Sequence, residues 1–304
     1  MQSVQSVKIG EPQRYRNMTV MPLIGRELDT GPEYLTLQEA LKEESLEVTE
    51  LDEGGSVPEL RVRNLSGQNV LLLDGEELMG AKQNRVLNTT VMVAGQTEVI
   101  VPVSCTEQGR WDYKSAMFKD SEVMMTNKIR ALKSRSVSTS LKMTNCYYSD
   151  QMEVWDGIED LCMSSGSYSH TGAMKAAYLQ TAESLAGYRD AFPLLPNQRG
   201  VLVYLNDHMV GCELVSRSKA YEQLHGKLLD SFALDAVIEP EAEASEEIGK
   251  EKAESFLREI PSWQTERFQS VGLGEDLRME NSNSHGNALL VEDVVVHATT
   301  FGSK

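Results

Sequence analysis

The sequence lacks most of the features that identify a functional class directly. Its four cysteines, Cys105, Cys146, Cys162 and Cys212, are scattered and form no CxxC pair, and its five histidines show no zinc spacing. There is no phosphate-loop motif, and the Gly-Leu-Gly at 272–274 does not open a strand–helix unit. These absences exclude a zinc module, a phosphate-loop nucleotidase and a dinucleotide-binding fingerprint.

Long apolar runs and an excess of basic residues are also absent. No stretch approaches the roughly 18 consecutive apolar residues of a membrane-spanning helix. The first ten residues lack the apolar core of a signal peptide, so we expect a cytoplasmic protein with reduced thiols. The net charge of −17 argues against binding to nucleic acid or to a membrane surface, since both are polyanionic. A small anionic ligand, which senses only a local patch, is compatible with this charge.

The apolar pattern of the 304 residues predicts a single α+β domain, 1–304, with a largely antiparallel sheet flanked by helices. Strands are predicted at 19–24, 60–62, 69–73, 77–81, 90–93, 98–103, 200–215 (as strand–turn–strand) and 288–296. The segment 34–51 is predicted to form an amphipathic helix that runs into a short strand. Further helices are predicted at 151–163, 173–189, 219–233 and in the charged segment that ends near 260. The basic segment 111–142 ends in a Ser-rich run at 134–140 that we expect to be mobile. Its basic residues Lys128, Arg130, Lys133, Arg135 and Lys142 form either a lid over an anionic ligand or a solvated helix face followed by a loop.

Two segments resemble each other at a constant offset of 131 residues. Aligned without gaps, 70–82 and 201–213 share three identities, and Gly75 falls on Asn206. Both residue types tolerate a positive φ in a tight turn. Either two unrelated hairpins look alike, or the core is duplicated. A duplicated core would have halves at about 19–111 and 196–304, separated by a helical insert at about 112–195.

The two segments continue into very different residues. The first leads into Lys82, Gln83, Asn84 and Arg85, whereas the corresponding residues 213–216 include an apolar pair. In a strand, Lys82 and Asn84 would point to one face, and Gln83 and Arg85 to the other. These polar side chains are candidate ligand-binding residues. The alternative is a solvated edge strand that charge protects from aggregation.

Acidic and aromatic candidates adjoin this run. Glu76, Glu77 and Glu107 are candidate general bases, and an oxygen-preferring ion such as Mg²⁺ is one option for the acidic turn, although no metal site is predicted. After Gly109, Arg110 offers a bidentate fork for phosphate and the Trp111 indole a face for stacking a base. The alternative places Trp111 in the core with Arg110 over its ring.

The run LLLDGEELMGAKQNRVLN at 71–88, together with IVPVSCTEQGRW at 100–111, resembles the signature of the ADP-ribosylglycohydrolase- and rhodanese-phosphatase-superfamily-associated protein domain. The resemblance covers most of the chain, but its specificity lies in these two runs. It implies a context of NAD and ADP-ribose metabolism and assigns no catalytic role to any residue.

These residues support two functional hypotheses. The first is binding, with hydrolysis as a further option, of a small nucleotide-derived anion of the ADP-ribose or NAD class. Lys82, Arg85 and Arg110 would hold phosphate, and Trp111 would stack on the base. The second is a non-enzymatic module that assembles as a homo-oligomer or binds a partner, with the charged run forming ion pairs at an interface.

Overall fold

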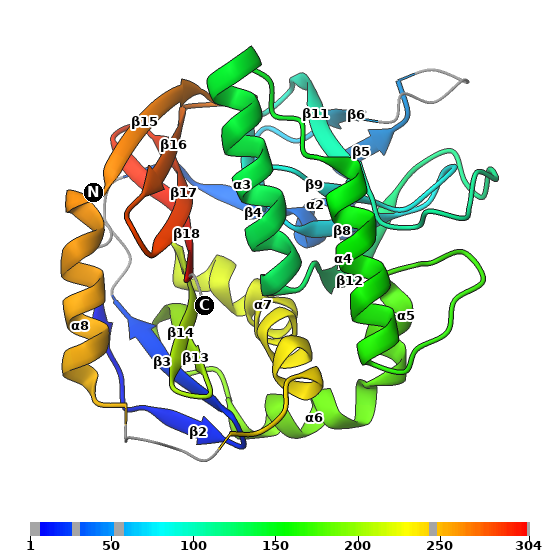
Figure 1. Cartoon of the computed structure of the whole chain (residues 1–304). Helices are drawn as coiled ribbons and strands as arrows, with labels where there is room; N and C mark the ends of the chain where they lie inside the picture. Colours follow the sequence, from blue (N-terminus) through cyan, green and yellow to red (C-terminus); the bar gives the residue numbers. More distant parts are fainter. Residues whose placement is uncertain (1–6, 26–30, 52–57, 243–247, 303–304) are drawn as a thin grey trace. The chain divides into compact units, whose positions relative to one another are not determined.

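The computed structural model (Figure 1) describes residues 7–25, 31–51, 58–242 and 248–302. These residues fall into two compact units. Unit 1 comprises Met1–Pro32, Glu183–Gln269 and Gly274–Lys304, and unit 2 comprises Glu33–Ala182 and Ser270–Leu273. Helices and mainly antiparallel strands occur in both units, which confirms the predicted α+β class. In the described part of the chain, no helix combines the length and the apolarity of a membrane-spanning segment.

Unit 1 is built on one antiparallel sheet, with nine strands among its described residues, in the order β1-β3-β13-β14-β18-β17-β16-β15 and with β2 beside β3. The strands are β1 (Lys8–Ile9), β2 (Gln13–Tyr15), β3 (Met18–Ile24), β13 (Gln198–Leu205), β14 (His208–Val215), β15 (Gln264–Gln269), β16 (Glu275–Glu280), β17 (Ser284–Val291) and β18 (Val294–Gly302). The helices are α6 (Ala182–Ala191), α7 (Ser218–Ile238), α8 (Lys250–Glu259) and the 3₁₀ turn η1 (Ile260–Ser262).

The central strand β13 is buried along its whole length because both faces of the sheet are covered there. Helix α7 packs against β13 and β14, while Leu202 and Tyr204 of β13 join an apolar cluster with Ala253 of α8. A strand that is covered on both faces contains few polar residues, which explains the run VLVYL.

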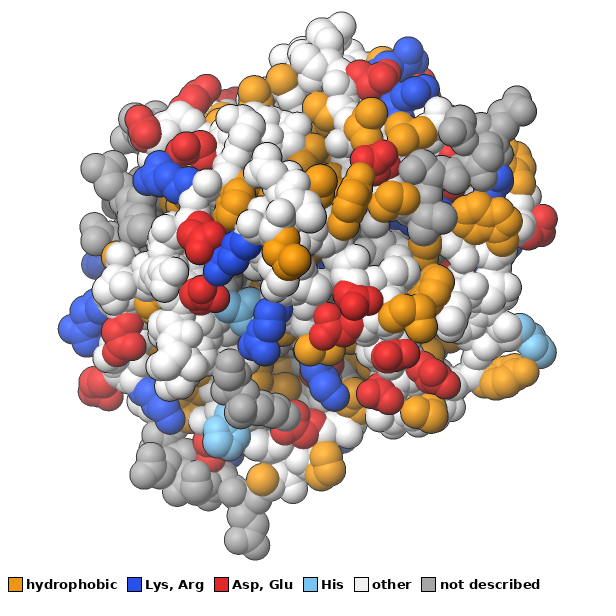
Figure 2. All heavy atoms as spheres, turned by 45° about the horizontal axis from the view of Figure 1, so that its top comes forward, with side chains coloured by type: hydrophobic (Ala, Val, Ile, Leu, Met, Phe, Trp, Pro, Cys, Tyr) orange, Lys and Arg blue, Asp and Glu red, His pale blue; other side chains and the backbone are white. Residues whose placement is uncertain are grey.

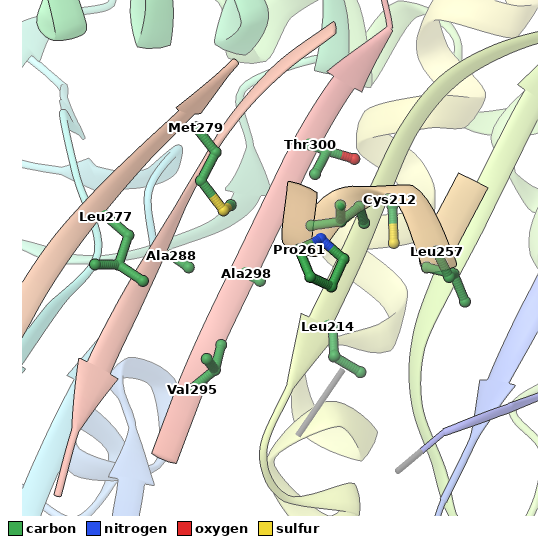
Figure 3. Close-up of a pocket in the computed structure, with 11 residues that line it drawn as sticks. Cys212, Leu214, Leu257, Pro261, Leu277, Met279, Ala288, Val295, Ala298 and Thr300 are labelled. Atoms are coloured by element: carbon green, nitrogen blue, oxygen red, sulfur yellow. The ribbon is translucent and has the colours of Figure 1, made fainter. Parts of the chain in front are cut away.

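A small apolar cavity lies between this sheet and the segment from α8 to η1. Figure 3 shows Cys212 and Leu214 of β14 and Ala298 of β18 on the sheet, with Leu257 of α8 and Pro261 of η1 opposite. Its volume is about 30 Å³. Ligand sites usually start at about 300 Å³, so we interpret this cavity as a packing void.

Unit 2 contains a six-stranded sheet, β12-β8-β9-β11-β6-β5, and a three-stranded sheet, β10-β7-β4, again over the described residues. The strands are β4 (Tyr34–Thr36), β5 (Leu46–Thr49), β6 (Glu59–Asn64), β7 (Asn69–Leu72), β8 (Glu76–Met79), β9 (Arg85–Leu87), β10 (Val91–Val93), β11 (Glu98–Cys105) and β12 (Lys119–Met124). The helices are α2 (Leu37–Lys42), α3 (Asn127–Thr144), α4 (Gln151–Ser164) and α5 (Lys175–Gln180).

Local sequence explains several of these elements. Strand β6 alternates, with Leu60 and Val62 buried in the core of unit 2 and Arg61 between them directed outward. Helix α2 begins at a capping box formed by Thr36 and Glu39. Helix α3 lies beside α4, and α4 in turn contacts β11 (Figure 1).

The two segments related by 131 residues share a tight turn but differ in strand pairing. Gly75 and Asn206 both adopt a positive φ, of 89° and 46°. Strands β13 and β14 pair directly, as expected for a hairpin. Strand β7 instead pairs with β4 and β10, and β8 pairs with β9 and β12. The correspondence therefore covers the turn and does not extend to a common hairpin.

Three sequence-based expectations need correction. The Ser-rich run 134–140 is not a mobile loop but the middle of α3, where Ser138 and Thr139 donate to the carbonyls four residues earlier. The predicted helix 173–189 breaks between α5 and α6 at Thr181. The predicted strand 288–296 is a hairpin of β17 and β18, whose turn contains Glu292 and Asp293, both with positive φ.

Gly75 allows a substitution test of the turn that leads into β8. A Cβ at this position would lie 2.5 Å from Nε of the buried Arg130, in a backbone conformation that L-residues avoid. We expect Gly75→Ala to lower the free energy of unfolding by about 2 kcal/mol or more. Urea denaturation measures this. Gly67→Ala, which has open space around its Cβ, is the matched control and should change stability by less than about 1 kcal/mol.

Candidate functional site

The polar run after β8 forms a buried turn rather than a strand. Residues 81–84 have no strand pairing, Ala81 adopts a φ of 40°, and β9 begins only at Arg85. The expected alternation of side chains between two faces is therefore wrong. The expectation of a solvated edge strand is wrong as well, because Gln83, Asn84 and Arg85 are all buried.

Arg110 is the centre of a hydrogen-bond network that binds this turn to the next one. Its guanidinium is buried, and each of its three nitrogens donates to the protein. The five acceptors are Glu107 Oε2 at 2.6 Å, the carbonyl oxygens of Ala81 at 2.9 Å, Asp112 at 3.1 Å and Gly80 at 3.3 Å, and Asn84 Oδ1 at 2.9 Å. A guanidinium that is engaged in this way has little capacity left for phosphate. Arg110 is thus a structural residue in this conformation, in contrast to its predicted role.

Glu107 extends the network to the segment that connects α4 with α5. Its Oε2 pairs with Arg110, and its Oε1 accepts from Thr171 Oγ1 at 2.7 Å. The backbone reinforces the link, since Gly109 N donates to Thr171 O at 2.8 Å. Gln83 Nε2 donates to the carbonyl of Glu107 at 3.0 Å. Glu107 therefore acts as a bridge between two loops.

Glu77 is a buried carboxyl opposite an irregular strand. Its partner strand β12 shifts register between Asp120 and Met124, and within this β-bulge Glu122 has a φ of 65°. Thr106 Oγ1 donates to Glu77 Oε1 at 2.6 Å. Burial raises the pKa of Glu77 from 4.5 to about 7, although hydrogen bonding by Thr106 and Ser121 acts in the opposite direction. A carboxyl of this kind exchanges protons near neutral pH.

Glu76 has a different role, because it stabilises the turn that precedes it. Its Oε2 accepts from Leu73 N at 2.8 Å, and its own N donates to Leu73 O at 3.1 Å. The adjacent Asp74 forms an ion pair with Lys133 of α3, and both side chains are fully buried. Lys133 Nζ also donates to Leu87 O at 2.9 Å. The carboxylates of Asp74 and Glu76 are therefore both engaged by groups of the protein.

The basic residues of α3 do not form a lid. Arg130 and Lys133 are buried, so α3 anchors the acidic turn. Across the described ranges, no group of three or more His, Cys, Asp and Glu side chains is arranged to hold a metal ion. Cys105 is buried too, and burial raises the pKa of its thiol, which disfavours a nucleophilic thiolate.

Trp111 lies at the surface with two cations beside it. Half of the side chain is exposed, so the expectation of a core tryptophan is wrong. Lys82 Nζ lies 5.3 Å and Arg85 Cζ 5.9 Å from the ring centroid, whereas Arg110 belongs to the network described above. On the face drawn in Figure 2, basic, acidic and apolar side chains are interspersed. The positive feature at Trp111 is its local pair of cations, Lys82 and Arg85.

Arg85 is fully buried yet retains hydrogen-bonding capacity. Its Nη1 donates to Gln83 Oε1 at 3.1 Å, and its Nη2 lies 3.6 Å from Glu50 Oε1. Within the described residues, Nε makes no hydrogen bond. The predicted residues thus form two groups: Glu107, Arg110, Gln83 and Asn84 hold loops together, whereas Lys82 and the buried Arg85 lie beside the exposed Trp111 ring.

Sequence reasoning missed a cavity in unit 2. It has a volume of about 340 Å³ and is lined by α4, by the segment after α4 and by Gln108. Trp155, Glu159 and Cys162 contribute to it from α4, with the i, i+4, i+7 spacing of one helix face. In the sequence, this spacing within the predicted helix 151–163 was the only indication that these three residues share one helix face.

The fold and the buried polar network together define an α+β protein whose distinctive residues lie in two adjoining turns. The profile of the ARG and Rhodanese-Phosphatase-superfamily-associated Protein domain matches residues 6–301, so the chain belongs to this family. The resemblance carried by 71–88 and 100–111 is confirmed. The name of the family links it to ADP-ribosylglycohydrolases. Comparisons with curated proteins and with solved structures give no significant match.

The network around Arg110 makes a prediction about stability. Arg110→Ala would leave the buried Glu107 carboxylate without its ion-pair partner, and we expect a loss of about 3 kcal/mol in the free energy of unfolding. Chemical denaturation measures the loss. Lys114→Ala, an exposed cation four residues later, is the control and should have little effect. Equal stability of the two variants would contradict the structural role.

Glu77 makes a prediction about pH. Because its pKa is higher in the folded than in the unfolded chain, the folded state binds more protons between about pH 4.5 and pH 7. Stability contributed by Glu77 is complete below this range and declines as pH rises through it, by about 3 kcal/mol in total. We expect the difference in unfolding free energy between wild type and Glu77→Gln to change by about 2.5 kcal/mol between pH 5 and pH 8, because part of the total is already lost at pH 5. A difference that is independent of pH would refute it.

Proposed function

We propose that unit 2 binds a small nucleotide-derived anion of the ADP-ribose or NAD class at the surface formed by Trp111, Lys82 and Arg85. The observation that carries the proposal is the half-exposed indole with two cationic groups within 6 Å of its centroid. An exposed indole stacks on a base, and a guanidinium pairs with phosphate through a planar fork. The family's link to ADP-ribosylglycohydrolases supports the ligand class.

Binding in this arrangement involves movement of the indole. Trp111 lies over the buried Arg85, in the segment between β11 and β12 that has little regular structure. When a phosphate enters, the ring turns outward, stacks on the base and uncovers the Arg85 guanidinium. Lys82, which is already partly exposed, makes the first contact. Gln83 keeps Arg85 in place through the bond to Nη1.

Hydrolysis is the second part of the proposal and depends on Glu77. All three acidic candidates accept hydrogen bonds from the protein, and Glu107 also forms an ion pair with Arg110. Glu77, with a pKa of about 7, suits proton transfer near neutral pH. Chromatography of ADP-ribose and NAD after incubation tests this part. Products with wild type that are lost in Glu77→Gln support it, and unchanged ligands limit the function to binding.

Isothermal calorimetry with ADP-ribose, ADP and NAD tests the binding site. We expect Trp111→Ala to weaken binding roughly tenfold or more, because it removes the stacking surface. Lys82→Ala should weaken binding and reduce its dependence on salt, because it removes a phosphate partner. Tyr113→Ala and Lys114→Ala are matched controls, since both are exposed residues of the same segment and should bind as wild type does.

The outcomes distinguish the anion-binding proposal from the hypothesis of a non-enzymatic assembly module. No heat with any of the three compounds in wild type overturns the anion site. Light scattering of the same variants gives the second reading. An unchanged mass with weakened binding supports a ligand site, whereas a lost oligomer with unaffected binding supports the assembly hypothesis.

A further inference from the structure

The cavity beside α4 is a concave site in unit 2, and its lining shares no residue with the Trp111 surface. At about 340 Å³, its volume falls within the range of small-molecule sites. We infer that it binds a small organic cation that carries a hydrogen-bond acceptor. This inference goes beyond the anion site and does not depend on it.

The wall of the cavity opposite α4 is held in place by hydrogen bonds. Thr171 is bonded to Glu107 through its side chain and to Gly109 through its carbonyl. Met174 N donates to Thr106 O at 3.0 Å, and Ser169 Oγ accepts from Ala173 N at 3.0 Å. A loop that is fixed at several points retains its shape, so little ordering is needed when a ligand binds.

The charge of the lining favours a cation. Glu159 is the one charged side chain among the described lining residues. Helix α4 contains four acidic residues and no Lys or Arg. An anion at this position would be repelled.

The aromatic and polar lining specifies the ligand further. Trp155 and Tyr168 both line the cavity, and aromatic faces with a nearby carboxylate are the usual means of binding organic ammonium groups. The Nε1 of Trp155 is buried, and it has no hydrogen-bond acceptor in the described part of the chain. An ester or amide oxygen on the ligand would satisfy this donor, which would otherwise cost stability.

Protection of Cys162 from alkylation provides a direct readout. Its thiol lines the cavity and is half-buried, whereas Cys146 is half-buried elsewhere and serves as the internal standard. The probes are acetylcholine, a cation with an ester acceptor, and 3,3-dimethylbutyl acetate, its uncharged isostere. Iodoacetamide labelling of the two cysteines is followed by mass spectrometry of their peptides.

We expect acetylcholine to slow labelling of Cys162 at least fivefold relative to Cys146, and the uncharged isostere to have less than half of that effect. Glu159→Gln should abolish the protection by acetylcholine, and Trp155→Phe, which keeps a ring but removes the N–H, should raise the half-protecting concentration severalfold. Asp160→Asn, which removes the adjacent exposed charge outside the lining, is the control and should retain protection.

The wild-type comparison decides the inference even if a variant folds poorly. Equal protection by the two probes would show that the cavity does not select a cation. Absence of protection by acetylcholine at concentrations on the order of 10 mM would show that it is not a site for this ligand class. Either result overturns the inference and leaves the anion site at Trp111 unaffected.

Discussion

The buried Arg110 guanidinium is the interaction on which the organisation of unit 2 depends. Five hydrogen bonds from one side chain join the turn at 80–84 to the turn at 107–112. Its partner Glu107 continues the connection to Thr171. A buried charge needs such complete pairing, because a guanidinium or carboxylate without partners is costly in the protein interior. The Trp111 surface and the cavity beside α4 both adjoin elements that this network positions.

This arrangement separates two uses of polar residues in one short stretch of sequence. Gln83 and Asn84 bond to neighbouring loops, and Glu76 bonds to its own turn. Lys82 and Arg85, on either side of that pair, lie beside the exposed indole. The structural residues fix the path of the turn through hydrogen bonds, and this path places the two cationic side chains beside the exposed ring. Structure and recognition are therefore not competing explanations of this polar run.

The fold class could be predicted from local patterns. Alternation in β6, the capping box of α2 and the positive φ at Gly75 are properties of neighbouring residues, and they were accessible from sequence. Strand pairing was less accessible, because β7 and β8 are joined by a tight turn yet belong to different sheets. The Ser-rich run was misassigned because its hydroxyls donate to helix carbonyls, a contact that composition does not reveal.

The sequence predicted which residues belong to the candidate site, but it did not predict their roles. The residue types at Arg110 and Lys82 are equally suited to phosphate, and only the three-dimensional structure shows that the first is saturated by protein acceptors. The exposure of Trp111 depends on where the chain leaves β11, which no local pattern specifies. The cavity is lined by α4, by the segment that follows it and by Gln108 from a part of the chain distant in sequence, and only the spacing along α4 could be recognised from the sequence.

The five-bonded guanidinium also has an evolutionary consequence. Two of its acceptors are side chains, Glu107 and Asn84, and three are backbone carbonyls that any residue would supply. A chain that lost Arg110 would leave the buried Glu107 carboxylate without its ion-pair partner, so Glu107 would have to be replaced as well. Drift at these three positions is thereby coupled, and divergent relatives should retain or exchange them as a set.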